Sequence, residues 1–196
     1  MEHTIIPLIV YAFATSATPG PNNMMLLASG ANFGVRRSLP HMLGISVGHA
    51  FMVVVMGLGL AAALHAQPQV MLLLKAASLA YVLWLAWKIA HSAAPTQGKV
   101  GASPLTFWQA AAFQWVNPKA IAMAITAATV YGGNGSFGAI LTVGLVFAAV
   151  NLPSVALWCA MGEALRAFLQ NPIRLRVFNW TMAGLLVASM VPVLWA

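Results

Sequence analysis

Long apolar stretches separated by short polar gaps dominate this chain of 196 residues. Several of the stretches reach about 20 residues, the length that an α-helix needs to cross roughly 30 Å of hydrocarbon. The pattern predicts an all-α membrane protein with six transmembrane helices, at 5–28, 41–64, 70–90, 107–131, 137–161 and 178–195.

The longest polar gap, residues 92–103, divides the predicted helices into two groups of three. Its Pro, Gly and Ser residues are typical of a flexible link. Because three is an odd number, two consecutive groups of similar design must cross the bilayer in opposite senses, as in the inverted repeats of many secondary transporters. We therefore expect a first three-helix repeat at 1–91, a cytoplasmic link at 92–103 and a second three-helix repeat at 104–196.

Lys and Arg residues gather in alternate gaps of this pattern, and cytoplasmic loops are the ones enriched in these residues. The gaps at 65–69 and 132–136 contain neither residue type. The basic gaps follow the first, third and fifth predicted helices, and the residues in or beside them are Arg36, Arg37, Lys88, Lys99, Arg166, Arg174 and Arg176. Both termini are therefore expected to face the periplasm.

The composition agrees with a membrane protein, since 61% of the residues are apolar and only 6% are charged, against about 25% charged in soluble domains. The net charge of +7 is scattered among the loops. It forms no basic face, so nucleic acid is not an expected partner. The only carboxylate side chains belong to Glu2 and Glu163, and Cys159 is the only cysteine. We expect no metal and no cofactor; the lipid bilayer is an expected partner, and a homo-oligomer is left open.

A helix-breaking motif, TPGPNN, lies inside the first predicted span. Its two prolines remove backbone donors and clash with preceding carbonyls, so the helix must break or kink. A half-helix that begins near Pro21 would present free N–H groups and the positive end of its dipole, which suit a carboxylate. The alternative is a kink that only helps packing. The candidate substrate-binding residues here are Pro19, Gly20, Pro21, Asn22 and Asn23.

The fourth predicted span has a counterpart, Asn117-Pro118-Lys119. A lysine at the centre of a span costs at least about 2.5–3.5 kcal/mol, so it usually faces a cavity and marks function. The alternative for Lys119 is a side chain that snorkels to the inner surface. We take these three residues as substrate-binding candidates. Lys75, near the start of the third predicted span, is expected to snorkel to the outer surface.

The second predicted span contains Gly44, Ser46, Gly48 and His49. Its G-x-S-x-G string resembles the nucleophile elbow of hydrolases, but that motif needs a strand-to-helix turn and a triad acid, so we reject it. The spacing of Gly44 and Gly48 lets a neighbouring helix backbone approach closely. His49 is either a hydrogen-bonded core residue or a titratable group on a proton path.

The fifth predicted span carries Asn151 and Pro153, again a polar side chain with a helix breaker. Asn151 is a substrate-binding candidate, with a packing kink as the alternative. Glu163 closes the span and is expected to pair with Arg166, three residues on. Because no carboxylate is expected in the membrane interior, proton coupling would require His49, Glu163 or the substrate itself.

Four segments of the sequence resemble the LysE/RhtB family of amino-acid exporters: TPGPNN at 18–23, the small-residue run at 44–48, YVLWLAWKIA at 81–90 and FWQAAAFQWVNPK at 107–119. The resemblance covers essentially the whole chain, and the first and third segments look most like the branch that exports cysteine and O-acetylserine. It implies an inner-membrane permease of bacteria, driven by the proton gradient. It also implies that the Pro-Gly-Pro and Asn-Pro-Lys residues matter, whereas His49 and Asn151 match no motif of the family.

We therefore expect a secondary transporter and not an enzyme, which exports a small zwitterionic amino acid like cysteine, O-acetylserine, homoserine or threonine. The substrate carboxylate would meet the amides after Pro21 and the Lys119 ammonium. Its amino group would meet carbonyls freed near Thr18 or Asn117, or the side chains of Asn23 or Asn151.

Two other classes of function are left open at this point. One is an intramembrane hydrolase, with Ser46 and His49 or Cys159 as candidate catalytic groups. The other is a structural membrane subunit whose helix breaks only serve packing.

Overall fold

The computed structural model describes residues 2–91 and 103–188, and every regular element in these two ranges is a helix. The all-α prediction is confirmed over this part of the chain. The elements are α1 (Glu2–Ala17), α2 (Pro21–Phe33), α3 (Val35–Val55), a π-helical turn (Met56–Leu60), α4 (Ala61–His65), α5 (Pro68–Ala90), α6 (Phe107–Phe113), a 3₁₀ turn (Gln114–Val116), α7 (Pro118–Tyr131), α8 (Phe137–Leu165), a 3₁₀ turn (Phe168–Gln170) and α9 (Pro172–Ala188). Nearly all of the predicted link and the last residues of the sixth predicted span lie outside the described residues.

The first and fourth predicted helices are both broken. α1 ends at Ala17 and α2 begins at Pro21, while Gly20 between them is fully extended, with φ 179° and ψ 177°. In the fourth, the 3₁₀ turn gives way to Asn117 in an extended conformation, and α7 begins at Pro118. In both places a proline with no backbone N–H occupies the first position of the second half-helix, where no donor is needed.

Three other prolines do not break their helices. Pro7, Pro40 and Pro153 lie inside α1, α3 and α8, and each is exposed. α8 continues without a break through Pro153 to Leu165.

The last predicted span begins too late, since α9 starts at Pro172 and not near 178. The reason is a helix cap: the Asn171 side-chain oxygen accepts hydrogen bonds from the backbone N–H groups of Ile173 and Arg174, at 2.9 and 3.2 Å. Such a cap stabilises the first turn even though its sequence is polar.

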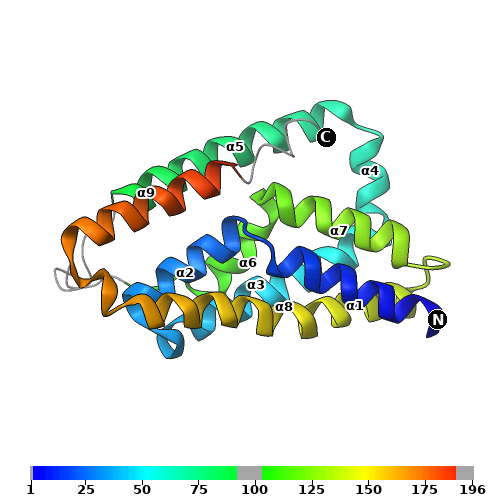
Figure 1. Cartoon of the computed structure of the whole chain (residues 1–196). Helices are drawn as coiled ribbons and strands as arrows, with labels where there is room; N and C mark the ends of the chain where they lie inside the picture. The colour runs from blue at the N-terminus through cyan, green and yellow to red at the C-terminus, as the bar shows by residue number, and fades with distance from the viewer. Residues whose placement is uncertain (1, 92–102, 189–196) are drawn as a thin grey trace.

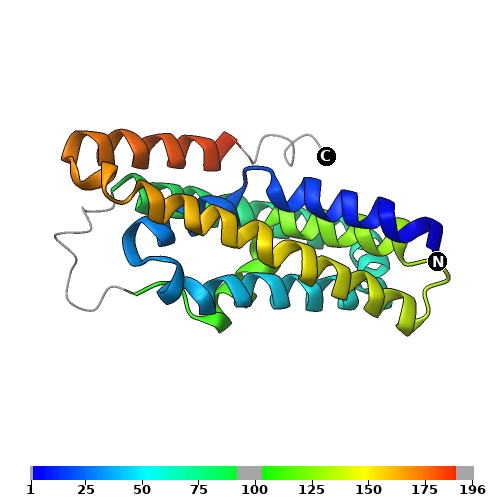
Figure 2. The ribbon, with the colours of Figure 1, turned by 60° about the horizontal axis from the view of Figure 1, so that its bottom comes forward.

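The helices form an elongated bundle around α8, which packs against α1, α2 and α3 (Figures 1 and 2). Beside this group, α5 and α9 pack on each other along one side of the bundle (Figure 1). Within the described ranges, two helices are long and apolar enough to cross a membrane, Val35–Ala63 and Phe137–Leu165. These two helices also pack on each other.

Glycines allow two pairs of helices to approach closely. A Cβ on Gly44 would collide with the Phe107 carbonyl, and one on Gly48 would lie 2.6 Å from the Ala111 Cα. The close helix approach expected at Gly44 and Gly48 is confirmed, and the helix that approaches them is α6. A second contact joins α2 and α8, where Gly30 lies against the Cys159 carbonyl and Gly162 lies against the Leu27 carbonyl.

The α2–α8 contact predicts a specific cost for a single methyl group. The change Gly162→Ala should lower the free energy of unfolding by about 1–3 kcal/mol, because the new Cβ meets backbone atoms that have no room to move. Reversible unfolding in mixed detergent micelles measures this quantity. Gly138→Ala, on the same helix, is the matched control, since its Cβ would meet nothing within 4 Å. Equal effects of the two changes would contradict the close contact.

Candidate functional site

The two helix breaks lie against each other and border a small cavity of about 20 Å³. Its walls come from the end of α1, the starts of α2 and α7, and single residues of α3 and α8. Seven of the predicted site residues line it: Gly20, Asn22, Asn23, His49, Asn117, Lys119 and Asn151. Pro19, Pro21 and Pro118 shape the breaks without lining the cavity.

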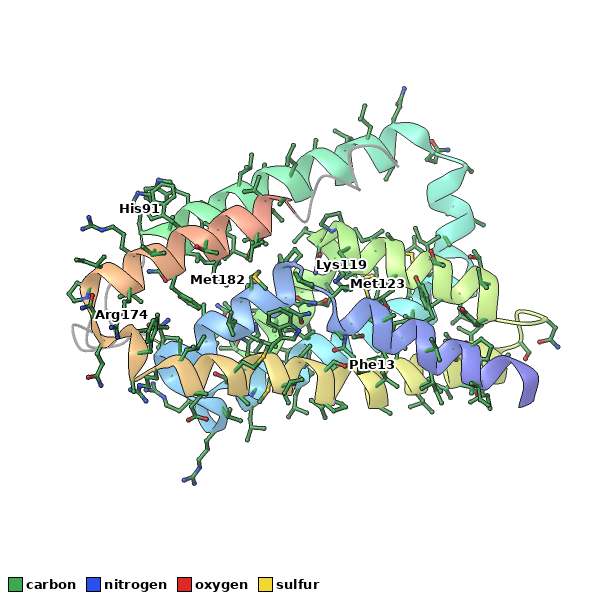
Figure 3. The ribbon with its side chains drawn as sticks, viewed as in Figure 1. Phe13, His91, Lys119, Met123, Arg174 and Met182 are labelled. Carbon is green, nitrogen blue, oxygen red and sulfur yellow. The ribbon has the colours of Figure 1, made fainter. Side chains whose placement is uncertain are left out.

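Lys119 joins the second half of the chain to the first break. Its ammonium donates hydrogen bonds to the Thr18 carbonyl at 2.8 Å, to the Thr18 hydroxyl at 2.8 Å and to the Pro19 carbonyl at 3.2 Å. Figure 3 shows the labelled Lys119 and Met123 on α7, beside the gap between α1 and α2. The lysine side chain therefore ends on the other helix break.

Gly20 leaves room for this lysine. A Cβ at Gly20 would lie 2.8 Å from Lys119 Cδ and 3.1 Å from Nζ. The backbone of Gly20 is extended, a conformation open to any residue, so the glycine is explained by space and not by its dihedral angles.

The carbonyls freed at the end of α1 already have partners. The Asn23 amide donates to the carbonyls of Ser16 and Thr18, both at 2.8 Å, and the Trp158 indole N–H donates to the Ala17 carbonyl at 3.2 Å. Trp158 was not among the predicted site residues, although an indole N–H in an apolar helix signals that an acceptor is needed nearby. The expectation that these carbonyls await a substrate amino group therefore needs correction.

A second contact joins the two breaks, and we call it the amide clasp because the side-chain amides of Asn22 and Gln114 form it. Asn22 Nδ2 donates to the side-chain oxygen Oε1 of Gln114 at 2.8 Å, and Gln114 Nε2 donates back to Asn22 Oδ1 at 3.1 Å. Gln114 is fully buried and was not among the predicted site residues. In each half of the chain, the residue just after the half-helix proline, Asn22 or Lys119, thus reaches the break of the other half.

Two half-helices begin at the cavity with uncapped ends. The N-cap residues are Gly20 for α2 and Asn117 for α7, and neither start has a side-chain cap. Free N–H groups and the positive ends of two helix dipoles therefore meet beside the Lys119 ammonium. This arrangement favours an anion such as a carboxylate.

Asn151 links three helices through side-chain hydrogen bonds. It accepts from the Ser46 hydroxyl at 3.0 Å and donates to the Ser16 hydroxyl at 3.0 Å, so α3, α8 and α1 are joined at the wall of the cavity. The hydroxyl of Ser46 is thereby directed to Asn151 and not to His49. Cys159 is buried in a separate apolar cluster with Met42 and other residues. The geometry gives no support to the hydrolase alternative.

Two residues of the cavity lining each carry a buried side-chain atom without a hydrogen-bond partner, His49 Nε2 and Asn117 Oδ1. The His49 ring packs against Phe147, with ring centres 5.2 Å apart. Buried polar atoms are paired in the great majority of cases, so each unpaired one calls for an explanation.

Glu163 lies away from the cavity lining, near Gly34 at the other end of α2. The structure gives no ion pair between the described side chains of Glu163 and Arg166; their only hydrogen bond joins the backbone N–H of Arg166 to the Glu163 carbonyl. The predicted pair is therefore not formed. In the described ranges, no cluster of three or more His, Cys, Asp or Glu side chains could hold a metal ion.

Comparison with known proteins gives a consistent set of relatives. The chain matches the family model described as LysE type translocator over residues 13–193. It is 33% identical over 191 residues to the cysteine/O-acetylserine efflux protein of Klebsiella pneumoniae, with 95% of each chain covered. It is 38% identical over 124 residues to the protein of the same name in Escherichia coli strain K12, with 62% of each chain covered. No solved structure matches the chain.

The amide clasp predicts energetic coupling between residues 92 positions apart. In a double-mutant cycle, Asn22→Ala and Gln114→Ala should couple by about 1–2 kcal/mol in the free energy of unfolding, because either change alone removes both hydrogen bonds. Unfolding of the four proteins in detergent measures the coupling. A parallel cycle of Asn22→Ala with Gln109→Ala, which is exposed on α6, should be additive within about 0.5 kcal/mol. Additivity in the first cycle as well would rule out the clasp.

Proposed function

This chain belongs to the LysE type translocator family, and from that premise we propose that it exports a small zwitterionic amino acid across the bacterial inner membrane. The observation that carries the proposal is the meeting of two half-helix starts and the Lys119 ammonium at one polar cavity. Discontinuous helices whose N-terminal ends point at an anionic substrate group are a recurring feature of secondary transporters.

The substrate carboxylate binds where the Lys119 ammonium and the starts of α2 and α7 meet. In the present conformation the ammonium is held by Thr18 and Pro19. The cavity of about 20 Å³ has room for little more than one or two water molecules. Entry of the substrate therefore requires Lys119 to leave Thr18 and Pro19 and take the carboxylate as its new acceptor.

The amino group of the substrate binds in a second part of the site, at the side-chain oxygen of Asn117. Asn117 lines the cavity and its buried Oδ1 lacks a donor, and an ammonium group offers three donors and no acceptor. This assignment replaces the carbonyls near Thr18, which Lys119 and Asn23 already occupy.

The substrate is small. Apart from polar groups, the cavity lining contains Ala120 and Met123, which leave room for a short side chain. The similarity to proteins named for cysteine and O-acetylserine efflux supports a substrate of this kind or one like homoserine or threonine.

Transport follows from six spans arranged as two inverted repeats, 1–91 and 104–196, with both termini in the periplasm. The exchange of contacts between the two breaks supports this arrangement, since Asn22 and Lys119 follow equivalent prolines and each reaches the opposite half. Rocking of one repeat against the other opens the site alternately to the two sides of the membrane.

The proton gradient drives the export. Two candidates for the proton come from the sequence, and they differ in position: His49 lines the cavity, whereas Glu163 lies away from it. A proton on either group, or on the substrate, would change the charge that crosses the membrane with each cycle.

Replacement of Lys119 by Met is expected to abolish export. Cells or proteoliposomes that carry the variant should release a labelled amino acid such as cysteine or O-acetylserine at the rate of empty controls, because the main cation of the carboxylate site is gone. Lys119→Arg should keep partial activity, since the charge remains on a larger group.

Arg36→Met is the matched control, because Arg36 also occupies the second position of its helix and is exposed at the start of α3. It should export normally. The amount of each protein in the membrane fraction is measured in parallel. Normal export by the Lys119→Met protein would refute the carboxylate site, and export by neither the unmodified protein nor any variant would favour a structural subunit.

The energy source is tested in proteoliposomes with defined ion gradients. A protonophore should stop accumulation of the amino acid against its gradient, whereas a sodium ionophore should leave it unchanged, because a proton is proposed as the coupling ion. Transport that survives the protonophore but stops with the sodium ionophore would assign the coupling to sodium.

A further inference from the structure

His49 is a polar residue of the cavity lining that neither the carboxylate site nor the amino-group site uses. It lies on α3, a helix without a break at the cavity, and is 2% exposed. Its Nε2 atom has no hydrogen-bond partner, and its ring is held against Phe147. A buried ring nitrogen without a partner, on a residue that lines a cavity, is suited to bind a group that the cavity admits.

The neighbouring polar groups on this wall are already paired with one another. Asn151 is bonded to Ser46 and to Ser16, whereas His49 Nε2, on the α3 side, is a buried hydrogen-bonding atom without a partner. The Lys119 ammonium and the two half-helix starts attract the carboxylate, and Asn117 Oδ1 attracts the ammonium. Of an amino acid, only the side chain then remains for His49.

We propose that His49 is a specificity-determining residue, which selects amino acids whose side chain carries a hydroxyl, thiol or ester group at the γ position. This inference rests on the proposed function and deepens it, since it names the substrate class of the same site. A hydroxyl both donates and accepts, so it pairs with Nε2 in either tautomer of the ring, and a thiol does the same more weakly. An ester oxygen accepts from Nε2 when that atom carries the proton.

The hydrogen bond between His49 and the substrate side chain explains why the selection between substrates would be strong. A site that hydrogen-bonds a substrate group rejects the analogue that lacks the group, because the buried polar atom is then left unpaired. An apolar wall, in contrast, separates a methyl from a hydroxyl group of the same size only weakly. Serine, cysteine and 2-aminobutyrate differ only in the atom at the γ position and therefore isolate this single contact.

The test compares transport of these three amino acids in proteoliposomes. The unmodified protein should transport cysteine or serine roughly tenfold or more faster than 2-aminobutyrate at equal, subsaturating concentration. In the His49→Leu protein the ratio should fall to within about twofold of one, while 2-aminobutyrate is still transported. The ratio is independent of the amount of active protein, and a role of His49 in proton coupling alone would leave it unchanged.

His41→Leu is the matched control. His41 is also 2% exposed on α3 and neither of its ring nitrogens has a partner, but it does not line the cavity. Its replacement should leave the ratio at the level of the unmodified protein. His49→Gln, which keeps a hydrogen-bonding group, is the second variant and should retain a preference in the same direction.

Three results would overturn the inference. They are a ratio near one in the unmodified protein, an unchanged ratio in the His49→Leu protein, and loss of all transport in both His49 variants while both are present in the membrane. If the unmodified protein transports no amino acid of a wider panel, the proposed function itself fails and this inference falls with it.

Discussion

The contact between the Lys119 ammonium and the broken end of α1 is the interaction on which the rest of the site depends. Without the other, the Lys119 ammonium or the freed carbonyls would each cost free energy in the membrane, because hydrocarbon solvates neither a cation nor a carbonyl that has lost its helical donor. Together they satisfy each other and fix α7 against the α1–α2 break. The same contact also holds a cation at the start of two half-helices. The contact that stabilises the fold therefore also creates a site that suits an anion.

The amide clasp between Asn22 and Gln114 extends this arrangement to the other break. Asn22 and Gln114 exchange two hydrogen bonds, so both breaks are tied by residues that directly follow or shortly precede a half-helix proline. The glycine contacts between α2 and α8 and between α3 and α6 then hold the surrounding helices at close range. The cavity is polar because it lies where two helices have lost their regular hydrogen bonds.

The sequence predicts much of this fold because its strongest signals are local. Apolar length gave the helices, Pro-Gly-Pro and Asn-Pro-Lys gave the two breaks, and the cost of a charge in the membrane pointed to Lys119. Proline alone was a poor guide, since Pro153 lies on an exposed face of an unbroken α8. Gln114 and Trp158 escaped prediction because their roles depend on partners 92 and 141 positions away, a relation that no local pattern contains. The distance of Glu163 from the cavity likewise follows only from the packing.

The long sequence separation of Lys119 from its partners has a consequence for how the protein is made. Thr18 is synthesised 101 residues before the lysine that satisfies its carbonyl. At about 5–20 residues per second, the broken first helix waits roughly 5–20 s for that partner to leave the ribosome. During this interval the unpaired polar atoms of the break need other hydrogen-bond partners, such as water or the insertion machinery. Biogenesis of the chain therefore includes a vulnerable stage that ends only when the second half arrives.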